Sequence, residues 1–340
     1  MRRRERGFSL IEMTVTLAIV SLLMLIVYSM IDQTVRVTMF NESHNDLAIV
    51  SQKGVNSIST ELLQTRLVFQ ENALGQSYRA ALQLSPRYPV WTDSLLPVIQ
   101  AGTGIAPDTT TRFTGNSLLV ARQLEPVSIT YDHDNNVNTA EIEFLADVYR
   151  FEYVYLTSSP SPAFSNSGRS LDLVMSKSIT YADYFQLSAM GAFTGRIVTK
   201  LIARGLTRAW DPGQPLASAF YALSGATDNT FDAAINNPAI ALAEAKTVLP
   251  GLRGGHISGK MVFSVAFVPT SPQPAYPLRL PIRLYAPADA TRPGFPSGFE
   301  VKIAGPAGNR QVMTRLVLMS HYGARHYESQ QAFAITAGKF

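Results

Sequence analysis

The chain has 340 residues, a formal net charge of +4 and no cysteine. The absence of cysteine excludes disulfides, thiol nucleophiles and zinc sites built on cysteine. Most of the positive charge comes from Arg2, Arg3, Arg4 and Arg6, and no comparable basic run follows them. The composition therefore does not indicate a nucleic-acid-binding surface, and the length leaves room for one large or two small domains.

The first expected element is a membrane-spanning helix over residues 8–31. This run of 24 predominantly apolar residues exceeds the ~20 residues that a helix needs to cross a bilayer. The arginines before it favour an N-terminus in the cytoplasm and a C-terminal part on the far side. Glu12 is the only charge in the run, and a carboxylate near the centre of a membrane costs about 2.5 to 3.5 kcal/mol, so Glu12 is expected to have a partner.

The residues R-G-F-S-L-I-E that open this run resemble the processing site of type IV prepilins. The resemblance covers residues 1 to about 70. It implies that residues 1–7 are a leader, that a prepilin peptidase cuts between Gly7 and Phe8, and that Phe8 is then N-methylated. A plain signal anchor that carries a Glu near one end is the alternative.

The resemblance also implies a role for Glu12, which lies fifth after the cut. In that family the carboxylate pairs with the new N-terminal amine of a neighbouring subunit or of its own chain. Opposite charges are strongly coupled in a low-dielectric environment, and the pair tolerates burial where either charge alone would not. Glu12 is thus expected to be a contact in filament assembly. The implied partners are other pilins or pseudopilins in the inner membrane, with no catalytic residue and no cofactor.

The helix is expected to continue outside the membrane through residues 32–70. No proline occurs before Pro86, and apolar or small residues recur with helical spacing as far as about residue 68. Two helices broken near Asn41 or Gly54 are the alternative.

Residues 71–340 predict an exported, β-rich domain. Short runs rich in β-branched and aromatic residues alternate with segments rich in Pro, Gly and Ser, which favours an antiparallel sheet with one face on the helix. The predicted strands are 78–84, 117–122, 127–131, 141–156, 171–176, 181–187, 196–204, 260–268, 278–285, 298–303 and 312–321.

A helical insertion is expected inside this domain. Residues 217–223 and 231–248 are rich in alanine, and a stop at Pro250 and Gly251 follows them. The insertion could divide the exported part near 206–255. The predicted fold class is α+β, with a long N-terminal helix packed on an antiparallel sheet.

A weak calcium motif lies between residues 132 and 143. Asp132, Asp134, Asn136 and Glu143 stand at the first, third, fifth and twelfth places of an EF-hand loop, but Val137 replaces the required glycine. A solvated hairpin turn is the preferred interpretation, because strands are predicted on both sides. No metal is assigned.

Two further sequence patterns give no support for an enzyme. Residues 254–260 read G-x-x-x-x-G-K, but Met261 replaces the Ser or Thr of a phosphate-binding loop. The five histidines show no metal-binding spacing.

The length of the exported part indicates which kind of pilin the chain resembles. Major pilins are usually about half as long, so the chain resembles the W-type minor pilins of type IV pili or the J-type minor pseudopilins of type II secretion. A minor pilin, present in low copy or at the tip of a pilus, is the first prediction. A minor pseudopilin and a membrane-anchored exported adhesin are the alternatives.

Overall fold

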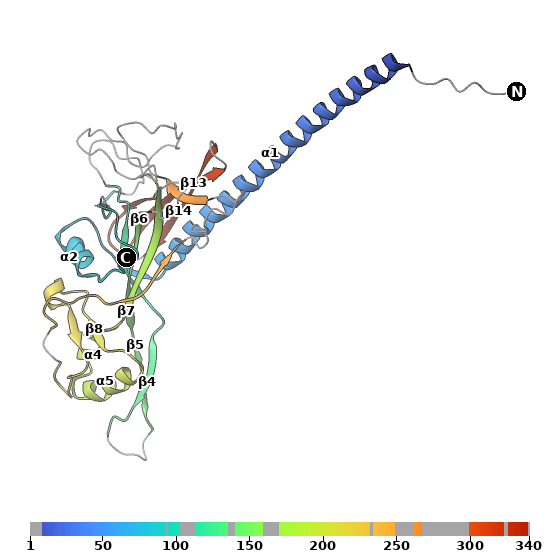
Figure 1. Cartoon of the computed structure of the whole chain (residues 1–340). Helices are drawn as coiled ribbons and strands as arrows, with labels where there is room; N and C mark the ends of the chain where they lie inside the picture. Colours follow the sequence, from blue (N-terminus) through green and yellow to red (C-terminus); the bar gives the residue numbers. More distant parts are fainter. Residues whose placement is uncertain are drawn as a thin grey trace. The chain divides into compact units, whose positions relative to one another are not determined.

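The computed structural model describes residues 9–92, 94–102, 113–134, 140–158, 170–231, 234–248, 262–266, 299–322 and 326–338, and Figure 1 traces the chain. Gly7, Phe8, Asn136, the 254–260 pattern and the predicted strand 278–285 lie outside the described residues. The chain forms two compact units, Met1–Asp46 and Leu47–Phe340.

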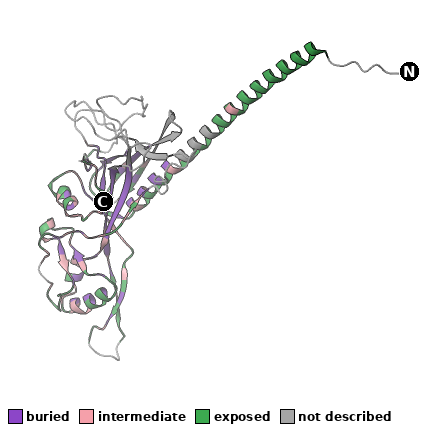
Figure 2. Cartoon of the chain, in the orientation of Figure 1, coloured by how far each residue is buried: buried purple, intermediate pink, exposed green. Residues whose placement is uncertain are grey.

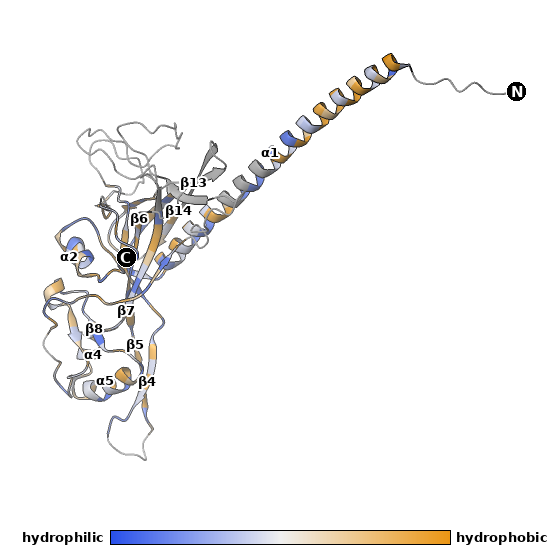
Figure 3. Ribbon diagram, in the orientation of Figure 1, coloured by the Kyte–Doolittle hydropathy of each residue, from blue (hydrophilic) through white to orange (hydrophobic). Residues whose placement is uncertain are grey.

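The helix α1 (Leu10–Leu62) is continuous, so the break considered near Asn41 or Gly54 is wrong. Its stretch Leu10–Thr38 is 29 residues long with a mean hydropathy of 2.5, and it is the one described helix that is long and apolar enough to cross a membrane. None of its most apolar window is buried within the chain, as the exposed colouring in Figure 2 and the apolar colouring in Figure 3 show. Such a surface needs lipid or other helices around it.

The second unit contains a large sheet whose described strands form the order β1-β3-β6-β7-β11-β13-β12-β2. β10 and β8 also pair with β7, β9 pairs with β8, and β14 pairs with β13. The strands are β1 (Thr65–Val68), β2 (Ile99–Gln100), β3 (Leu118–Gln123), β6 (Val148–Ser158), β7 (Ser170–Asp183), β8 (Arg208–Trp210), β9 (Phe220–Ala222), β10 (Leu242–Thr247), β11 (Val262–Ala266), β12 (Phe299–Ala304), β13 (Arg310–Tyr322) and β14 (His326–Gly338). Most pairs are antiparallel, but β7 with β8 and β12 with β2 are parallel, so the sheet is mixed.

The α+β architecture with a long apolar N-terminal helix is confirmed, and strict alternation along the strands explains how the sheet buries both faces. On β3, Leu118 and Val120 join the core that packs on Val55, Ile58 and Leu62 of α1. Successive strand residues point to opposite faces, so the residues between them lie on the other side. The end of α1 therefore packs on one face, as predicted. The helix ends at Leu62 rather than near residue 68, because β1 begins at Thr65 and pairs with β3.

The opposite face of the sheet is aromatic. Phe151 on β6 contacts Trp210 on β8 edge to face, with 4.9 Å between ring centroids. Tyr78, on α2 (Ala73–Ala81), covers this core and accepts a hydrogen bond of 3.0 Å from the buried indole nitrogen of Trp210. The prediction of a strand over 78–84 is therefore wrong. The helix begins at the Asn72 cap, whose side chain accepts from the Gly75 amide.

A third core lies between the two-stranded sheet of β4 (Val127–Tyr131) and β5 (Ile142–Ala146) and the helices α4 (Tyr184–Ser188) and α5 (Thr194–Ala203). The predicted strand 196–204 is wrong, since this segment is helical. Its buried apolar residues, Ile197, Val198 and Leu201, follow helical spacing. The strand was predicted because β-branched side chains such as Ile197 and Val198 are also common in strands. The strand predicted over 181–187 ends at Asp183, which caps α4 through the Gln186 amide.

The helical insertion predicted over 217–223 and 231–248 is also wrong. The first segment contains only a short 3₁₀ turn, η2 (Leu216–Ser218), before β9, and the second contains β10. A second 3₁₀ turn, η1 (Gly191–Phe193), precedes α5. β10 pairs with β7 in the central sheet, and this tertiary pairing outweighs the helix propensity of its alanines.

The aromatic core gives the domain a pH dependence. Burial raises the pKa of Tyr181 to about 12, and burial also raises the pKa of Tyr78 and Tyr155. A raised phenol pKa gives stability that is fully present below the ordinary value of 10.0 and is lost as the pH rises through the folded pKa, because the unfolded chain ionises first. The free energy of unfolding should therefore fall between about pH 10 and 12.

This prediction can be checked by denaturant unfolding of the detergent-solubilised chain, followed by tryptophan fluorescence at several alkaline pH values. In Tyr181→Phe the decline should be shallower by roughly 2 to 3 kcal/mol, which is the free energy of a shift of two pKa units. A Tyr181→Phe profile that matches the parent would contradict the assignment.

Candidate functional site

Glu12 lies in the first turn of α1 and is exposed. Its Oε2 accepts a hydrogen bond of 3.0 Å from the Ser9 amide, and the Ser9 Oγ accepts one of 3.3 Å from the Ile11 amide. The arrangement is a variant of the capping box: Glu12 accepts from the amide of the N-cap residue as in the box, while Ser9 accepts from the amide of Ile11 instead of that of Glu12. Both side chains satisfy backbone amides that the helix leaves unpaired. The carboxylate also stands at the positive end of the helix dipole.

This cap gives Glu12 a local partner in addition to the partner expected from the sequence, which is the N-terminal amine of a neighbouring subunit or of its own chain. The S-x-x-E spacing of Ser9 and Glu12 was readable in the chain, but it was not used as a signal. Gly7 and Phe8, the other residues of the expected processing site, lie outside the described residues. Cleavage, methylation and assembly through these residues therefore stay predictions.

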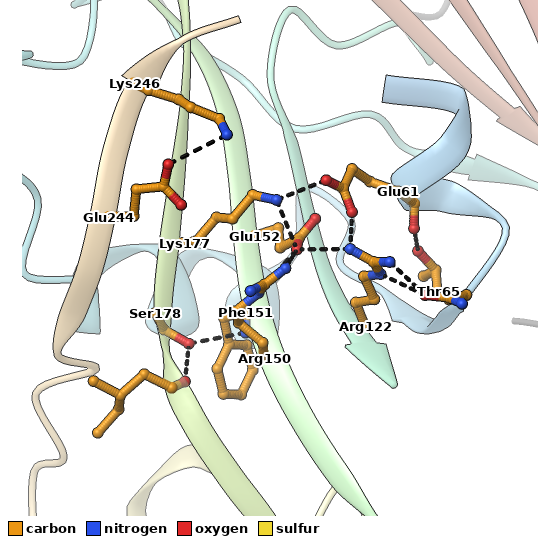
Figure 4. Close-up of polar contacts among 12 residues, drawn as sticks. Glu61, Thr65, Arg122, Arg150, Phe151, Glu152, Lys177, Ser178, Glu244 and Lys246 are labelled. Atoms are coloured by element: carbon orange, nitrogen blue, oxygen red, sulfur yellow. Dashed lines mark hydrogen bonds and ion pairs between the residues drawn. The ribbon is translucent and has the colours of Figure 1, made fainter. Parts of the chain in front are cut away.

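A second polar cluster lies in the domain, where the last turn of α1 meets the sheet (Figure 4). Glu152 on β6 is buried, and its Oε1 lies 2.6 Å from the Arg150 guanidinium, 3.5 Å from Arg122 Nη1 and 3.6 Å from Lys177 Nζ. Glu61 on α1 pairs with Arg122 and, at 2.6 Å, with Lys177. We call these five residues the α1-sheet ionic cluster.

Strand register assembles this cluster. Arg122 on β3 lies opposite Arg150 on β6, and Glu152 lies opposite Lys177 on β7. Burial lowers the pKa of Lys177 and of Arg122, and the charge of Glu152 opposes both shifts. Two carboxylates hold three cations, so each carboxylate is needed to keep the cations paired.

The ionic cluster was not predicted from the sequence, although a signal existed. Residues 149–156 alternate so that aromatic side chains fill one face, while the other face carries Arg150 and Glu152 before Val154. Charges at inward positions of a strand that is apolar elsewhere on the same face indicate a buried partner. The identity of that partner, Glu61 on a helix far away in the sequence, was not readable.

In the weak calcium motif, Asp132 and Asp134 follow β4 and Glu143 lies on β5, and the antiparallel pairing of these strands agrees with a hairpin turn. Asp132 and Asp134 lie close together with His133, as a group whose ligand atoms are within 4.8 Å of one another. Asp132 accepts from the Asp134 amide at 3.0 Å, and its carbonyl accepts from Arg196. Glu143 instead accepts from Ser128 across the hairpin, so the structure does not place it in that group.

Comparison with known proteins adds evidence at the N-terminus. Residues 2–28 match the family described as the prokaryotic N-terminal methylation motif. No curated protein and no solved structure matches the chain. The class of pilin-like proteins that carries this motif is structural rather than enzymatic. The methylation motif, the membrane-length helix and the α+β architecture are together consistent with a type IV pilin-like protein.

Proposed function

We propose that the protein is a minor pilin, a low-copy structural subunit of a type IV pilus. The methylation motif at residues 2–28 is the observation that carries the proposal. Its residues 10–28 lie on a helix whose most apolar window is not buried in the described part of the chain. In the membrane that surface contacts lipid, and in a filament it contacts the helices of other subunits. The large second unit, Leu47–Phe340, favours sparse incorporation over the close packing of a major subunit.

The proposal assigns the N-terminal residues in order. A prepilin peptidase removes residues 1–7, the amine of Phe8 is methylated, and the Glu12 carboxylate pairs with an N-terminal amine in the assembled filament. The N-terminus lies in the cytoplasm before processing, since the arginines of the leader are retained there. The domain is then on the far side of the inner membrane and reaches the cell surface with the filament.

A minor pseudopilin of a type II secretion system is the alternative, because the same motif and helix serve both assemblies. An adhesin that uses the N-terminal segment only for delivery would share the membrane anchor but would not enter a filament. These functions differ in where the processed chain is found.

The test is fractionation of producing cells with an antibody against the exported domain. Filaments sheared from the surface should contain the processed chain at a small fraction of the major subunit, and mass spectrometry should show a methylated Phe8 as the first residue. A processed chain that stays in the envelope, combined with loss of protein secretion on deletion of its gene, would replace the pilus assignment by the pseudopilus. An uncleaved chain would overturn both.

A further inference from the structure

A groove lies in the second unit between the last turns of α1 and strand β14. Its volume is about 380 Å³, and it is lined by Asn56, Ser59, Thr60 and Leu63 at the end of the helix and by the strand residues 335–337. The four helix-side positions follow the spacing i, i+3, i+4 and i+7, so one stripe of α1 forms the wall. This groove belongs neither to the methylation motif nor to the ionic cluster.

The residues of the strand wall indicate that the groove reaches the outer edge of β14. Three consecutive strand residues line it, and because their side chains alternate between the two faces, they share one cavity only at an edge. The other edge of β14 is fully occupied, since β13 pairs with it from Arg310 opposite Gly338 to Tyr322 opposite His326. Among the described residues, no strand pairs with the outer edge.

The chemistry of the walls is uncharged. None of the seven lining residues carries a charge, while Leu63 and Ile335 stand exposed at 68% and 55%. The buried Ser59 Oγ finds no hydrogen-bond partner among the described residues. A partner that fits here brings uncharged side chains and hydrogen-bonding groups.

The part of β14 that lines the groove lacks the devices that keep an edge strand from pairing, although Glu328 lies near the start of the strand and Lys339 directly follows its last residue. Natural edges carry lysines, prolines or bulges, because a row of unpaired backbone groups is a template for another strand. Residues 329–338 read S-Q-Q-A-F-A-I-T-A-G, without charge or proline, and the pairing with β13 shows no register shift. The described outer edge of β14 therefore offers unpaired backbone groups to a further strand.

We propose that an extended, uncharged peptide segment of another protein subunit adds to the outer edge of β14 and fills the groove against α1. A strand supplies the amide and carbonyl groups that the ladder of β14 lacks, with alternate side chains directed toward Ser59 and Leu63. A helix is excluded as the occupant that satisfies this edge, because its own backbone groups are already paired internally. The proposal concerns the domain and does not depend on how the N-terminal helix assembles.

The test uses the absence of cysteine in the parent chain. Ala337→Cys and Thr60→Cys each place a single thiol in the full chain, one on either wall, and Leu145→Cys places one on β5 as an exposed control. A maleimide labels the thiols in intact producing cells and, separately, in the chain purified in detergent. The thiols at positions 337 and 60 should react at least about tenfold more slowly in cells than after purification, because a covered thiol is inaccessible. The thiol at position 145 should react equally in both.

Two charged substitutions test whether the occupant lies at this edge, and the spacing of cross-links tests whether it is a strand. Ala337→Lys places a charge on the edge and, combined with Thr60→Cys, should restore labelling of the thiol at position 60 in cells, whereas Ala337→Ser should not. Thr60→Lys acts from the helix wall, so combined with Ala337→Cys it should restore labelling at position 337 without touching the β13–β14 hairpin. Single cysteines are then placed along the segment of the partner that covers the groove. Disulfide cross-links to the position-337 thiol should form at every second residue of that segment.

Full reactivity of the position-337 thiol in cells overturns the proposal. Cross-links at every third or fourth partner residue, which would indicate a helix, and cross-links to β14 of a second copy overturn it as well. These results are separate from the proposed function. An Ala337→Cys chain that enters pili with a fully reactive thiol retains its function as a pilin without the strand addition, whereas one that stays out of pili with a protected thiol shows the reverse.

Discussion

Replacing Glu12 by alanine is expected to remove the protein from filaments while the leader is still cleaved. The carboxylate has two physical roles, since it caps α1 through the Ser9 amide and is proposed to pair with the amine of Phe8. Inside a dry helical packing, an amine without its counter-charge costs several kcal/mol, because neither lipid nor apolar side chains can solvate it. The amount of processed chain in sheared pili should fall by about tenfold or more, as an unfavourable term of only about 1.4 kcal/mol already gives that factor.

The variant Glu12→Gln separates the two roles of this residue. Glutamine can occupy the same place in a capping box, so it keeps the helix start while removing the charge. We expect Glu12→Gln to be excluded from pili as strongly as Glu12→Ala. Glu42→Ala, on an exposed glutamate of the same helix outside the span Leu10–Thr38, is the matched control and should enter pili normally. Normal incorporation of Glu12→Gln would show that Glu12 acts only as a cap.

Replacing Glu152 by methionine is expected to destabilise the domain by about 3 to 5 kcal/mol, the typical cost of breaking a buried ion pair by removing one partner. Glu152 is 1% exposed, and it lies within 4 Å of Arg122, Arg150 and Lys177. Its removal leaves three cations with the one carboxylate of Glu61. The measurement is denaturant unfolding in detergent, with tryptophan fluorescence as the signal.

A neighbouring ion pair provides the control for this prediction. Glu244 and Lys246 lie 3.2 Å apart beside the ionic cluster, but their side chains are about half exposed (Figure 4). Glu244→Met should change the unfolding free energy by less than about 1 kcal/mol. The double variant Glu152→Met with Lys177→Met should lose less stability than the sum of the two single variants, by about 0.5 to 3 kcal/mol. Additive losses would mean that the charges do not act together.

The correct predictions from the sequence concern elements whose pattern lies within one continuous segment of the chain. The membrane-length run and the long helix are local patterns, readable from hydropathy and from the absence of proline before Pro86. Strands such as β3 and β4 were found for the same reason, because their alternation and turn residues lie within a few positions. The α+β class followed from these elements.

The errors arose where distant contacts decide the outcome. Residues 194–203 could be a strand by composition, and they are a helix because Ile197 and Leu201 pack into the core beside β4. The alanines of β10 favour a helix until pairing with β7 is counted. The ionic cluster joins Glu61 to Lys177, which lies 116 positions away, and no local pattern records such a pair.

The ionic cluster also fixes how the helix is seated. Along β6 the face toward α1 changes from apolar at Val154 to ionic at Glu152, while α1 presents Ile58 and Leu62 beside Glu61. A purely apolar interface would let α1 shift along the sheet, because one apolar side chain can take the place of another at a small cost in free energy. If α1 slid by one turn, about 5.4 Å, Glu61 would leave Lys177 and Arg122 and face an apolar row. The ionic cluster therefore favours one axial position of the end of α1 on the sheet. A force along the helix axis would have to break several charge pairs together.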